Sequence, residues 1–274
     1  MTSVSTLLSQ VLQFDTDNRR SFPWRQSYDP YHVLVSEYML QQTQTGRVVE
    51  AFSNFLSRFP SVHDLASAKR QDVLACWVGL GYNRRAVALQ NTAKLLVSEH
   101  DGIVPSDEEA LRSLPGIGPY TAAAIVIFAY NKRAIAIETN IRTVVVHHCM
   151  HGESDVSDTS IATVMERLLS EAERRSLAYR DLYAALMDYG AHLKRSGIRV
   201  SCRNTSSQGT FKGSVRQARG VIIKTLVSGT CSVTDRHIVP CTRQTWEQAL
   251  SGLIRDGMIE KSGGGYVLCG ESAT

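Results

Sequence analysis

The sequence has no long apolar run and no closely spaced cysteines, and these absences exclude several classes of protein. No run approaches the roughly 20 apolar residues that a membrane-spanning helix needs. The six cysteines show no Cys-x-x-Cys spacing, so neither a zinc site nor an iron–sulfur cluster is indicated. They are most simply free thiols of an intracellular protein. We therefore expect no bound metal among them and no membrane partner.

Little else in the composition departs from that of an ordinary globular protein. Hydrophobic residues make up 43% of the 274 residues and charged residues 20%, which excludes an intrinsically disordered chain. The first residues carry no basic segment ahead of an apolar block, so we expect no signal peptide. The length allows two or three modest domains.

Apolar residues at spacings of three and four predict helices through most of the chain. Because strands and helices do not alternate, we expect an all-α fold rather than a parallel sheet. Ser106-x-x-Glu109 has the form of a capping box ahead of a helix. The expected helices lie at residues 33–38, 46–59, 71–79, 84–99, 109–114, 121–130 and 161–175.

A polar stretch rich in serine and glycine, residues 200–213, marks a change of pattern near the end of the chain. After it we expect two helices, at 215–227 and 242–256, and then a short β-hairpin with strands at 256–261 and 265–268. Helices followed by a hairpin resemble a small winged-helix-like α+β module.

The segment from Leu114 to Thr121, Leu-Pro-Gly-Ile-Gly-Pro-Tyr-Thr, predicts a turn that can bind a phosphate between two helices. Gly116 and Gly118 have no side chain that would keep a phosphate from the backbone amides. The free N–H groups at the start of the next helix favour an anion. A plain turn between helices fits the same pattern, so both interpretations stay open here.

Basic residues are concentrated in one part of the chain, although the net charge is only +4. Between Tyr189 and Thr234 there are eight basic residues and no aspartate or glutamate. Such a stretch suits a phosphate backbone, and a solvated linker without a partner is the alternative. The eight are Lys194, Arg195, Arg199, Arg203, Lys212, Arg216, Arg219 and Lys224.

Two glutamates stand in apolar surroundings, where a carboxylate is costly to bury. Glu37 lies in a mostly apolar helix, and Glu138 follows an apolar run where we expect a new helix to begin. Carboxyl groups so placed can act as general acids. Glycosidic-bond cleavage needs two in different settings, one to protonate the leaving group and one to stabilise the cationic sugar. A buried structural acid paired with an arginine is an equal alternative for Glu37.

Four segments share their residues and their order with one known family. They are 22–25 (Phe-Pro-Trp-Arg), 35–45 (Val-Ser-Glu-Tyr-Met-Leu-Gln-Gln-Thr-Gln-Thr), 77–82 (Trp-Val-Gly-Leu-Gly-Tyr) and 114–122 (Leu-Pro-Gly-Ile-Gly-Pro-Tyr-Thr-Ala). They resemble the adenine DNA glycosylases (MutY-type), which belong to the helix-hairpin-helix (HhH-GPD, endonuclease III-like) superfamily of base-excision repair proteins. The resemblance covers residues 20–195.

The resemblance implies a helix-hairpin-helix glycosylase fold for the main part of the chain. The core would occupy residues 1–200, with a six-helix barrel at 28–131 and a second lobe formed by the N-terminal helix and 132–200. A basic and polar loop at 201–213 would lead to the winged-helix-like module at 214–270.

The resemblance also implies catalytic roles. Glu37 would protonate the adenine ring, and Glu138, in place of the family's aspartate, would stabilise the oxocarbenium-like sugar. Asn140 would position that carboxylate or the nucleophile. Tyr120 stands where lyase-type relatives carry a catalytic lysine. Without an amine for a Schiff base, hydrolysis without strand cleavage is expected.

The DNA-binding residues that the resemblance implies lie in three groups. Gln42 and Tyr82 match the residues that enter the base stack as adenine flips out. Leu114, Gly116 and Gly118 belong to the phosphate-binding hairpin, with a monovalent cation on its carbonyls. From the basic stretch we expect Arg195, Arg203 and Arg216 to contact DNA.

Three departures from the family stand out. The four-cysteine loop expected after Gly190 is missing, so we expect no iron–sulfur cluster and no other cofactor. Glu138 is one methylene longer than the aspartate it replaces, which can move the carboxylate by about 1 Å. We expect the winged-helix-like module to stand where the family carries the C-terminal domain that reads 8-oxoguanine.

We therefore interpret the chain as a monofunctional DNA glycosylase that removes adenine from mispairs with guanine or 8-oxoguanine. Its partner would be double-stranded DNA in the cytoplasm or nucleoid, and the protein would act as a monomer. A thymine/uracil mismatch glycosylase is the alternative enzyme, and a non-catalytic DNA-binding protein is the alternative from another class.

Overall fold

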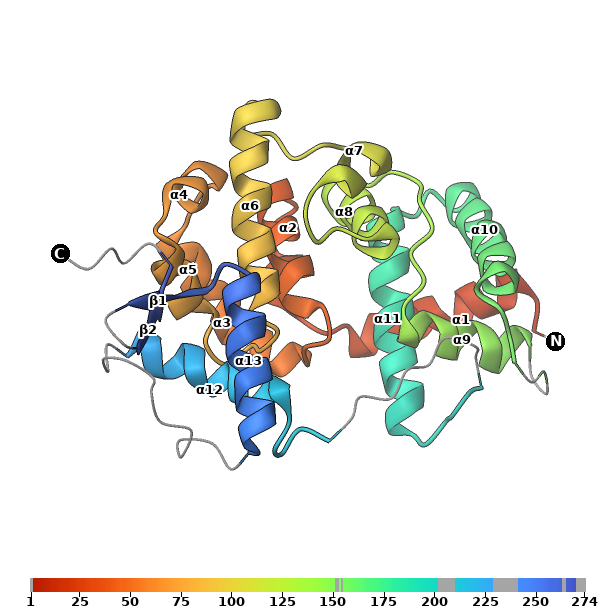
Figure 1. Cartoon of the computed structure of the whole chain (residues 1–274). Helices are drawn as coiled ribbons and strands as arrows, with labels where there is room; N and C mark the ends of the chain where they lie inside the picture. Colours follow the sequence, from red (N-terminus) through yellow and green to blue (C-terminus); the bar gives the residue numbers. More distant parts are fainter. Residues whose placement is uncertain are drawn as a thin grey trace. The chain divides into compact units, whose positions relative to one another are not determined.

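Helices form nearly all of the regular structure in the computed structural model of the chain (Figure 1). The structure describes residues 2–150, 153, 155–201, 210–228, 241–262 and 265–269. Within this part, strands occur only as one antiparallel pair near the C-terminal end. The all-α class with a small C-terminal strand pair is therefore confirmed.

The chain divides into two compact units, each with its own core. The Glu138 unit contains Met1–Val33, Ser106–Ser113 and Ile117–Ser207. The Glu37 unit contains Leu34–Pro105, Leu114–Gly116 and Gln208–Thr274. The domain boundaries expected from the sequence stay a prediction.

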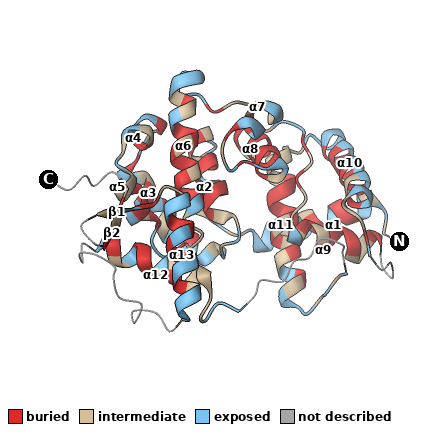
Figure 2. Cartoon of the chain, in the orientation of Figure 1, coloured by how far each residue is buried: buried red, intermediate tan, exposed pale blue. Residues whose placement is uncertain are grey.

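The Glu138 unit is built around a buried helix, α8, and a packed helix pair, α9 and α11. Residues of α8 are apolar on every side, and most of the helix is coloured as buried in Figure 2. The helix ends where Asn131 adopts a left-handed conformation, with φ +51°. The elements are α1 (Val4–Asn18), η1 (Pro23–Arg25), α7 (Glu108–Ser113), α8 (Pro119–Tyr130), α9 (Thr139–Cys149), α10 (Asp158–Arg174) and α11 (Tyr179–Arg195).

A buried ion cluster holds α11 against the segment that follows α1. Asp188 is 1% exposed, and its carboxylate accepts hydrogen bonds from the side chains of Arg20 and Arg25 at 2.7 to 3.0 Å. Burial alone would raise the pKa of Asp188, but the two guanidinium groups hold that pKa below its ordinary value. Asp188 therefore fixes α11 to the segment after α1. In the sequence this residue looks like an ordinary packing residue of a helix.

The Glu37 unit surrounds α2 and α6, and it also includes the C-terminal module. Tyr38 and Trp77 are fully buried in its core. The elements are α2 (Pro30–Leu40), of which residues 34–40 belong here, α3 (Thr45–Arg58), α4 (Val62–Ser67), α5 (Arg70–Trp77), α6 (Arg84–Glu99), α12 (Val215–Val227), α13 (Arg243–Arg255), β1 (Ile259–Ser262) and β2 (Gly265–Leu268).

Polar contacts attach the C-terminal module to the helices of the Glu37 unit. Asp256, which ends α13, pairs with Arg219 of α12 at 2.5 Å and with Arg84 of α6 at 3.4 Å. Arg70 donates to the Gly257 carbonyl at 3.3 Å. The basic stretch seen in the sequence is thus partly neutralised by an acid from outside it.

Most expected helices are present, with small differences at their ends. The expected bounds of α6 and α12 agree with the structure, whereas α5 ends at Trp77 rather than at residue 79 and α10 begins at Asp158 rather than at 161. The expected capping box at Ser106 is wrong. The Asp107 carboxylate caps α7 instead, accepting from the amides of Glu109 and Ala110 at 3.0 Å, because a charged oxygen is the stronger acceptor.

None of the helices in the described part of the chain combines the length and the apolar character that spanning a membrane requires. Arg203 and most of the expected 201–213 loop lie outside the described residues.

Candidate active site

Glu37 lies inside α2, on a helix whose other side chains are almost all apolar. The sequence Val-Leu-Val-Ser-Glu-Tyr-Met-Leu buries every residue from Val33 to Met39, and Glu37 itself is only 7% exposed. Asp29 caps the helix by accepting from the amides of Tyr31 and His32 at 2.9 and 3.1 Å. The carboxyl group is therefore removed from bulk water by a rigid element.

A buried arginine fixes the end of this helix and two turns beside it. The guanidinium of Arg85 donates to the last carbonyls of α2, Tyr38 O at 2.8 Å and Met39 O at 2.9 Å, and to Gln41 O at 2.6 Å. It also donates to Gly81 O at 2.9 Å. Burial lowers the pKa of Arg85 to about 10. The sequence does not indicate this role, because Arg85 follows Arg84 at the start of an ordinary helix.

The two turns carry Gln42 and Tyr82, the residues expected to enter the base stack. Both adopt left-handed backbone conformations, with φ +55° and +48°. Such conformations cost a non-glycine residue of order 1–3 kcal/mol and concentrate at functional sites. Gln42 is exposed and Tyr82 half-buried. Trp77, by contrast, is fully buried and is a core residue.

Tyr82 is held between two arginines. Arg85 and Arg216 each place the guanidinium carbon 5.6 Å from the centre of the Tyr82 ring. Arg216, from α12, also donates to the Tyr82 hydroxyl at 2.7 Å. The structure thus brings together two residues that the sequence analysis predicted separately, and it links the C-terminal module to the turn at Tyr82.

The hairpin turn between α7 and α8 needs glycine at one of its two glycine positions. Gly116 has φ +80°, and a Cβ there would lie 2.9 Å from Ala88 Cβ and 3.1 Å from the Tyr38 ring. Gly118, the residue before α8, has φ −91°, and no described atom lies within 4 Å of a Cβ placed there. That open side gives a ligand access to the first amides of α8.

Two hairpin carbonyls already accept hydrogen bonds from side chains. Gly116 O accepts from Gln41 Nε2 at 3.2 Å, and Pro115 O accepts from the hydroxyls of Tyr38 and Thr92. With two donors on its oxygen, Pro115 does not fit as a ligand for a monovalent cation. The expected cation stays a prediction, and no part of the chemistry below depends on it.

Glu138 caps the N-terminus of α9 with its own side chain. Its Oε1 accepts from the amides of Asn140 at 2.8 Å and Ile141 at 2.9 Å. A carboxylate suits this place because a helix N-terminus carries a partial positive charge. Burial raises the pKa of the Glu138 carboxyl, while these amides, Lys194 and Arg142 act in the opposite direction. The carboxylate is therefore oriented by its own helix.

Asn140 is packed tightly against Gly190 of helix α11. A Cβ at Gly190 of α11 would lie 2.3 Å from Asn140 O and 2.8 Å from Asn140 Cβ. Only glycine allows α11 to approach so near. The two predicted site residues Glu138 and Asn140 are thus brought together, and α11 determines where they stand.

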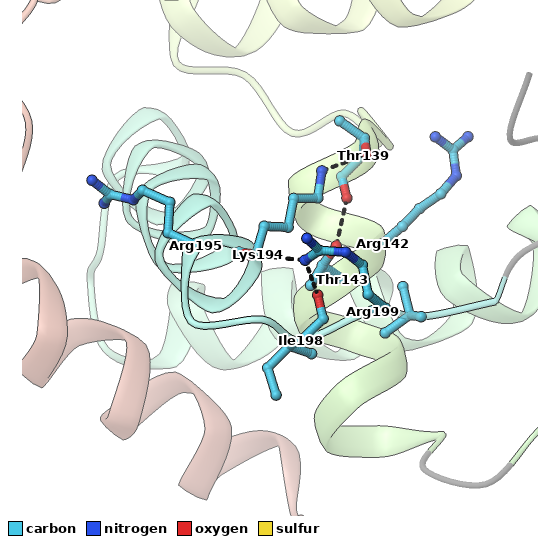
Figure 3. Close-up of a pocket in the computed structure, with 8 residues that line it drawn as sticks. Thr139, Arg142, Thr143, Lys194, Arg195, Ile198 and Arg199 are labelled. Atoms are coloured by element: carbon cyan, nitrogen blue, oxygen red, sulfur yellow. Dashed lines mark hydrogen bonds between the residues drawn. The ribbon is translucent and has the colours of Figure 1, made fainter. Parts of the chain in front are cut away.

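A basic pocket of about 400 Å³ opens beside this helix start (Figure 3). It lies between α9 and the end of α11, and Arg195 is one of its lining residues. The others are Thr139, Arg142, Thr143, Lys194, Ile198, Arg199 and Val200.

The remaining predicted residues have simpler surroundings. Tyr120 is half-buried at the second position of α8, and the Leu114 side chain is buried in the core. Arg195 is exposed. Arg203 lies outside the described residues. Glu37 and Glu138 belong to different units, each with the surroundings given above.

In the described residues, no cluster of three histidine, cysteine or acidic side chains could hold a metal ion. His148, which follows His147, shares a hydrogen bond of 3.0 Å with the Tyr189 hydroxyl, as expected for a structural histidine. Cys76, Cys149, Cys241 and Cys269 are free thiols. The expectation that no cofactor binds stays a prediction.

Comparison with known proteins assigns the chain to one family and identifies similar proteins. Residues 35–187 match the family described as "HhH-GPD superfamily base excision DNA repair protein". The chain is 34% identical to the adenine DNA glycosylase of Mycolicibacterium smegmatis, over 97% of both chains. It is 31% identical to the adenine DNA glycosylase of Mycobacterium tuberculosis, over 96% of this chain and 93% of the relative.

A solved structure agrees with the fold. The structure titled as a thermostable thymine-DNA glycosylase superposes with a TM-score of 0.59 and 26% sequence identity. The superposition covers 69% of this chain and 86% of that one. The mycobacterial similarity, in contrast, extends through almost the whole chain and so includes the C-terminal module.

Proposed function

Because the chain belongs to the HhH-GPD superfamily of base excision DNA repair proteins, we propose that it is a monofunctional adenine DNA glycosylase. It would hydrolyse the N-glycosidic bond of adenine mispaired with guanine or 8-oxoguanine in double-stranded DNA. The two mycobacterial relatives named adenine DNA glycosylase support the choice of base, since they match nearly the full length. We further propose that it acts as a monomer and works in the cytoplasm or nucleoid.

The burial of Glu37 is the observation that carries this proposal. A protonated carboxyl group at 7% exposure can transfer its proton to a ring nitrogen of a flipped adenine. As the bond between the sugar C1′ and the base nitrogen breaks, its electron pair leaves with the protonated, neutral adenine. The sugar is left as an oxocarbenium-like cation.

Glu138 supplies the negative charge that this cation needs. Its carboxylate is oriented by the amides of Asn140 and Ile141, so it requires little reorganisation during the reaction. A water molecule then adds to C1′ and loses a proton, for which a carboxylate is a suitable acceptor. The product is an abasic site with an intact strand, because Tyr120 offers no amine for a Schiff base.

Recognition of DNA would use the hairpin and the two strained turns. The amides after Gly118 would bind a phosphate, and Gln42 and Tyr82 would enter the stack as the adenine leaves it. Unstacking costs a few kcal/mol, and side chains already held in the required conformation reduce the further cost of ordering them.

A thymine/uracil mismatch glycosylase is the second candidate, supported by the thymine-DNA glycosylase structure that is 26% identical to this chain. A single-turnover assay on duplexes with A:8-oxoG, A:G, T:G and U:G separates the two. We expect abasic product from an adenine mispair, with strand breaks appearing only after alkali. Product from T:G or U:G alone would instead support the second candidate.

A non-catalytic DNA-binding protein is tested in the same assay. That alternative predicts binding without product from any of the four duplexes, and no change when Glu37 is replaced by Gln.

A further inference from the structure

Two residues of α11, one helical turn apart, contact the two residues that follow Glu138. Gly190 lies against Asn140, as described above, and Lys194 donates from Nζ to Thr139 Oγ1 at 2.5 Å (Figure 3). Residues separated by four positions share one helix face. The same face of α11 therefore fixes both residues after Glu138.

Lys194 lies between the end of one helix and the start of another. It belongs to the last turn of α11, where the helix dipole favours a cation, and its ammonium group reaches the first residue of α9, where the dipole favours an anion. Lys194 is also half-buried: burial, Arg199 and Arg142 lower its pKa, and the negative charge of Glu138 acts against them.

The end of α11 is itself held in place. Gly197 has φ +90°, and Ile198 N donates back to Leu193 O at 3.0 Å, which closes the last turn. Arg199 donates to the carbonyls of Lys194 at 2.9 Å and Ile198 at 3.1 Å. The backbone that carries Lys194 is thus rigid, which a positioning residue requires.

The other charged groups around Glu138 have separate partners. Arg142, on α9, pairs with Asp158 of α10 at 2.8 and 2.9 Å. Arg199 contacts the carbonyls named above. Lys194, in contrast, meets a neutral hydroxyl on the residue next to Glu138.

We propose that Lys194 is a positioning residue for Glu138: its ammonium group, held by the Thr139 hydroxyl, fixes the first residue of α9 and places a positive charge beside the Glu138 cap. The proposal rests on the proposed function of Glu138.

The test compares single-turnover excision of adenine by full-length variants between pH 5 and 9. Because Glu138 must be ionised, we expect the rate to fall as the pH drops through its pKa. Lys194→Met should raise that pKa. The fall of the rate on the acidic side of the pH profile, the acid limb, should then move up by about one pH unit, so the loss of rate is greatest at low pH. Lys194→Arg should restore the position of the limb.

Two further variants separate charge from position. Thr139→Val keeps the ammonium but removes its acceptor, so we expect a lower rate and an unmoved limb. Lys132→Met is the matched control, because Lys132 also donates to a hydroxyl, Ser106 Oγ at 2.7 Å. We expect it to match wild type in rate and in pH profile.

A uniform loss of rate at every pH in Lys194→Met, with an unmoved limb, would overturn the proposal. The Glu138 carboxyl can also be titrated by NMR in the protein alone. There Lys194→Met should raise its pKa relative to wild type, and an unchanged pKa would equally contradict the proposal. This measurement distinguishes failure of the Lys194 role from failure of the glycosylase function, which shows instead as absence of product from wild type.

Discussion

Glu37 and Glu138, the two candidate catalytic carboxylates, lie in different surroundings. Glu37 lies in the middle of an apolar helix, where its side chain is almost completely buried. Glu138 lies at the first position before a helix, where two amides donate to one of its oxygens. Burial disfavours the charged form of an acid and raises the pKa of Glu138, but there the amides of a helix N-terminus act against it, whereas a residue in the middle of a helix has no such amides.

This difference indicates how two identical side chains can be given different tasks. An acid that must deliver a proton benefits from apolar surroundings, and one that must stabilise a cation benefits from oriented dipoles. In this chain the backbone around each residue makes the distinction. The predictions below test it, beginning with the largest expected effect.

Glu37→Gln should lower the single-turnover rate of adenine excision by about 10²–10⁴-fold, the usual contribution of a general acid. Because Gln keeps the shape of the side chain, affinity for the mispaired duplex should change little. Glu50→Gln, an exposed position on α3, is the control and should behave as wild type. Equal rates for the wild type and Glu37→Gln would remove Glu37 from the mechanism.

Glu138→Gln should cost about 10²–10³-fold in the same rate, the usual effect of losing one preorganised electrostatic contact. Its amide oxygen can still cap α9, so thermal unfolding should shift only slightly. Glu138→Asp should retain most of the activity, since aspartate is a good N-cap and keeps the charge. If Glu138→Asp loses as much rate as Glu138→Gln, the position of the carboxylate, set by the length of the side chain, matters more than its charge.

Gly190→Ala should destabilise the protein by about 1–3 kcal/mol, because the added methyl overlaps the Asn140 backbone. Chemical denaturation measures the free energy of unfolding. Gly220→Ala on α12 is the matched control, since no described atom lies within 4 Å of its added Cβ. There we expect a gain of about 0.4–1 kcal/mol. Equal effects at the two glycines would show that the contact between α11 and Asn140 is looser than described.

Arg216→Met should have the smallest effect, a loss of about fivefold or less in the excision rate from duplex DNA, matching the roughly 0.5–1 kcal/mol of a cation–π contact at a solvent-accessible site. Its cause would be a less ordered Tyr82, so base extrusion should slow while affinity for the duplex changes less. Fluorescence of 2-aminopurine in place of the mispaired adenine follows base extrusion directly. A loss of duplex affinity as large as the loss of rate would assign Arg216 to general DNA binding instead.

Sequence reasoning located the local features of the fold well. Apolar spacing predicted α6 and α12, and the change of pattern near residue 138 predicted the start of α9. The short helix α4 and the cap of α7 were not predicted correctly, since one turn of helix carries little periodicity and two adjacent polar residues competed for the cap.

The interactions that set the candidate site could not be read from the sequence. Arg85, Gly190 and Lys194 act on residues 40 to 55 positions away in the chain. Lys194 stands out only as one of eight basic residues expected near a phosphate backbone, and no local pattern distinguishes Arg85 or Gly190. Only tertiary packing shows that Gly190 admits Asn140 or that Arg85 collects the carbonyls of two turns.

The single guanidinium of Arg85 has a consequence for redesign. One group donates to the carbonyl before Gln42 and to the carbonyl before Tyr82, so we expect a change of length in either turn to disturb the other. A redesign of these two turns should therefore replace both of them together with Arg85.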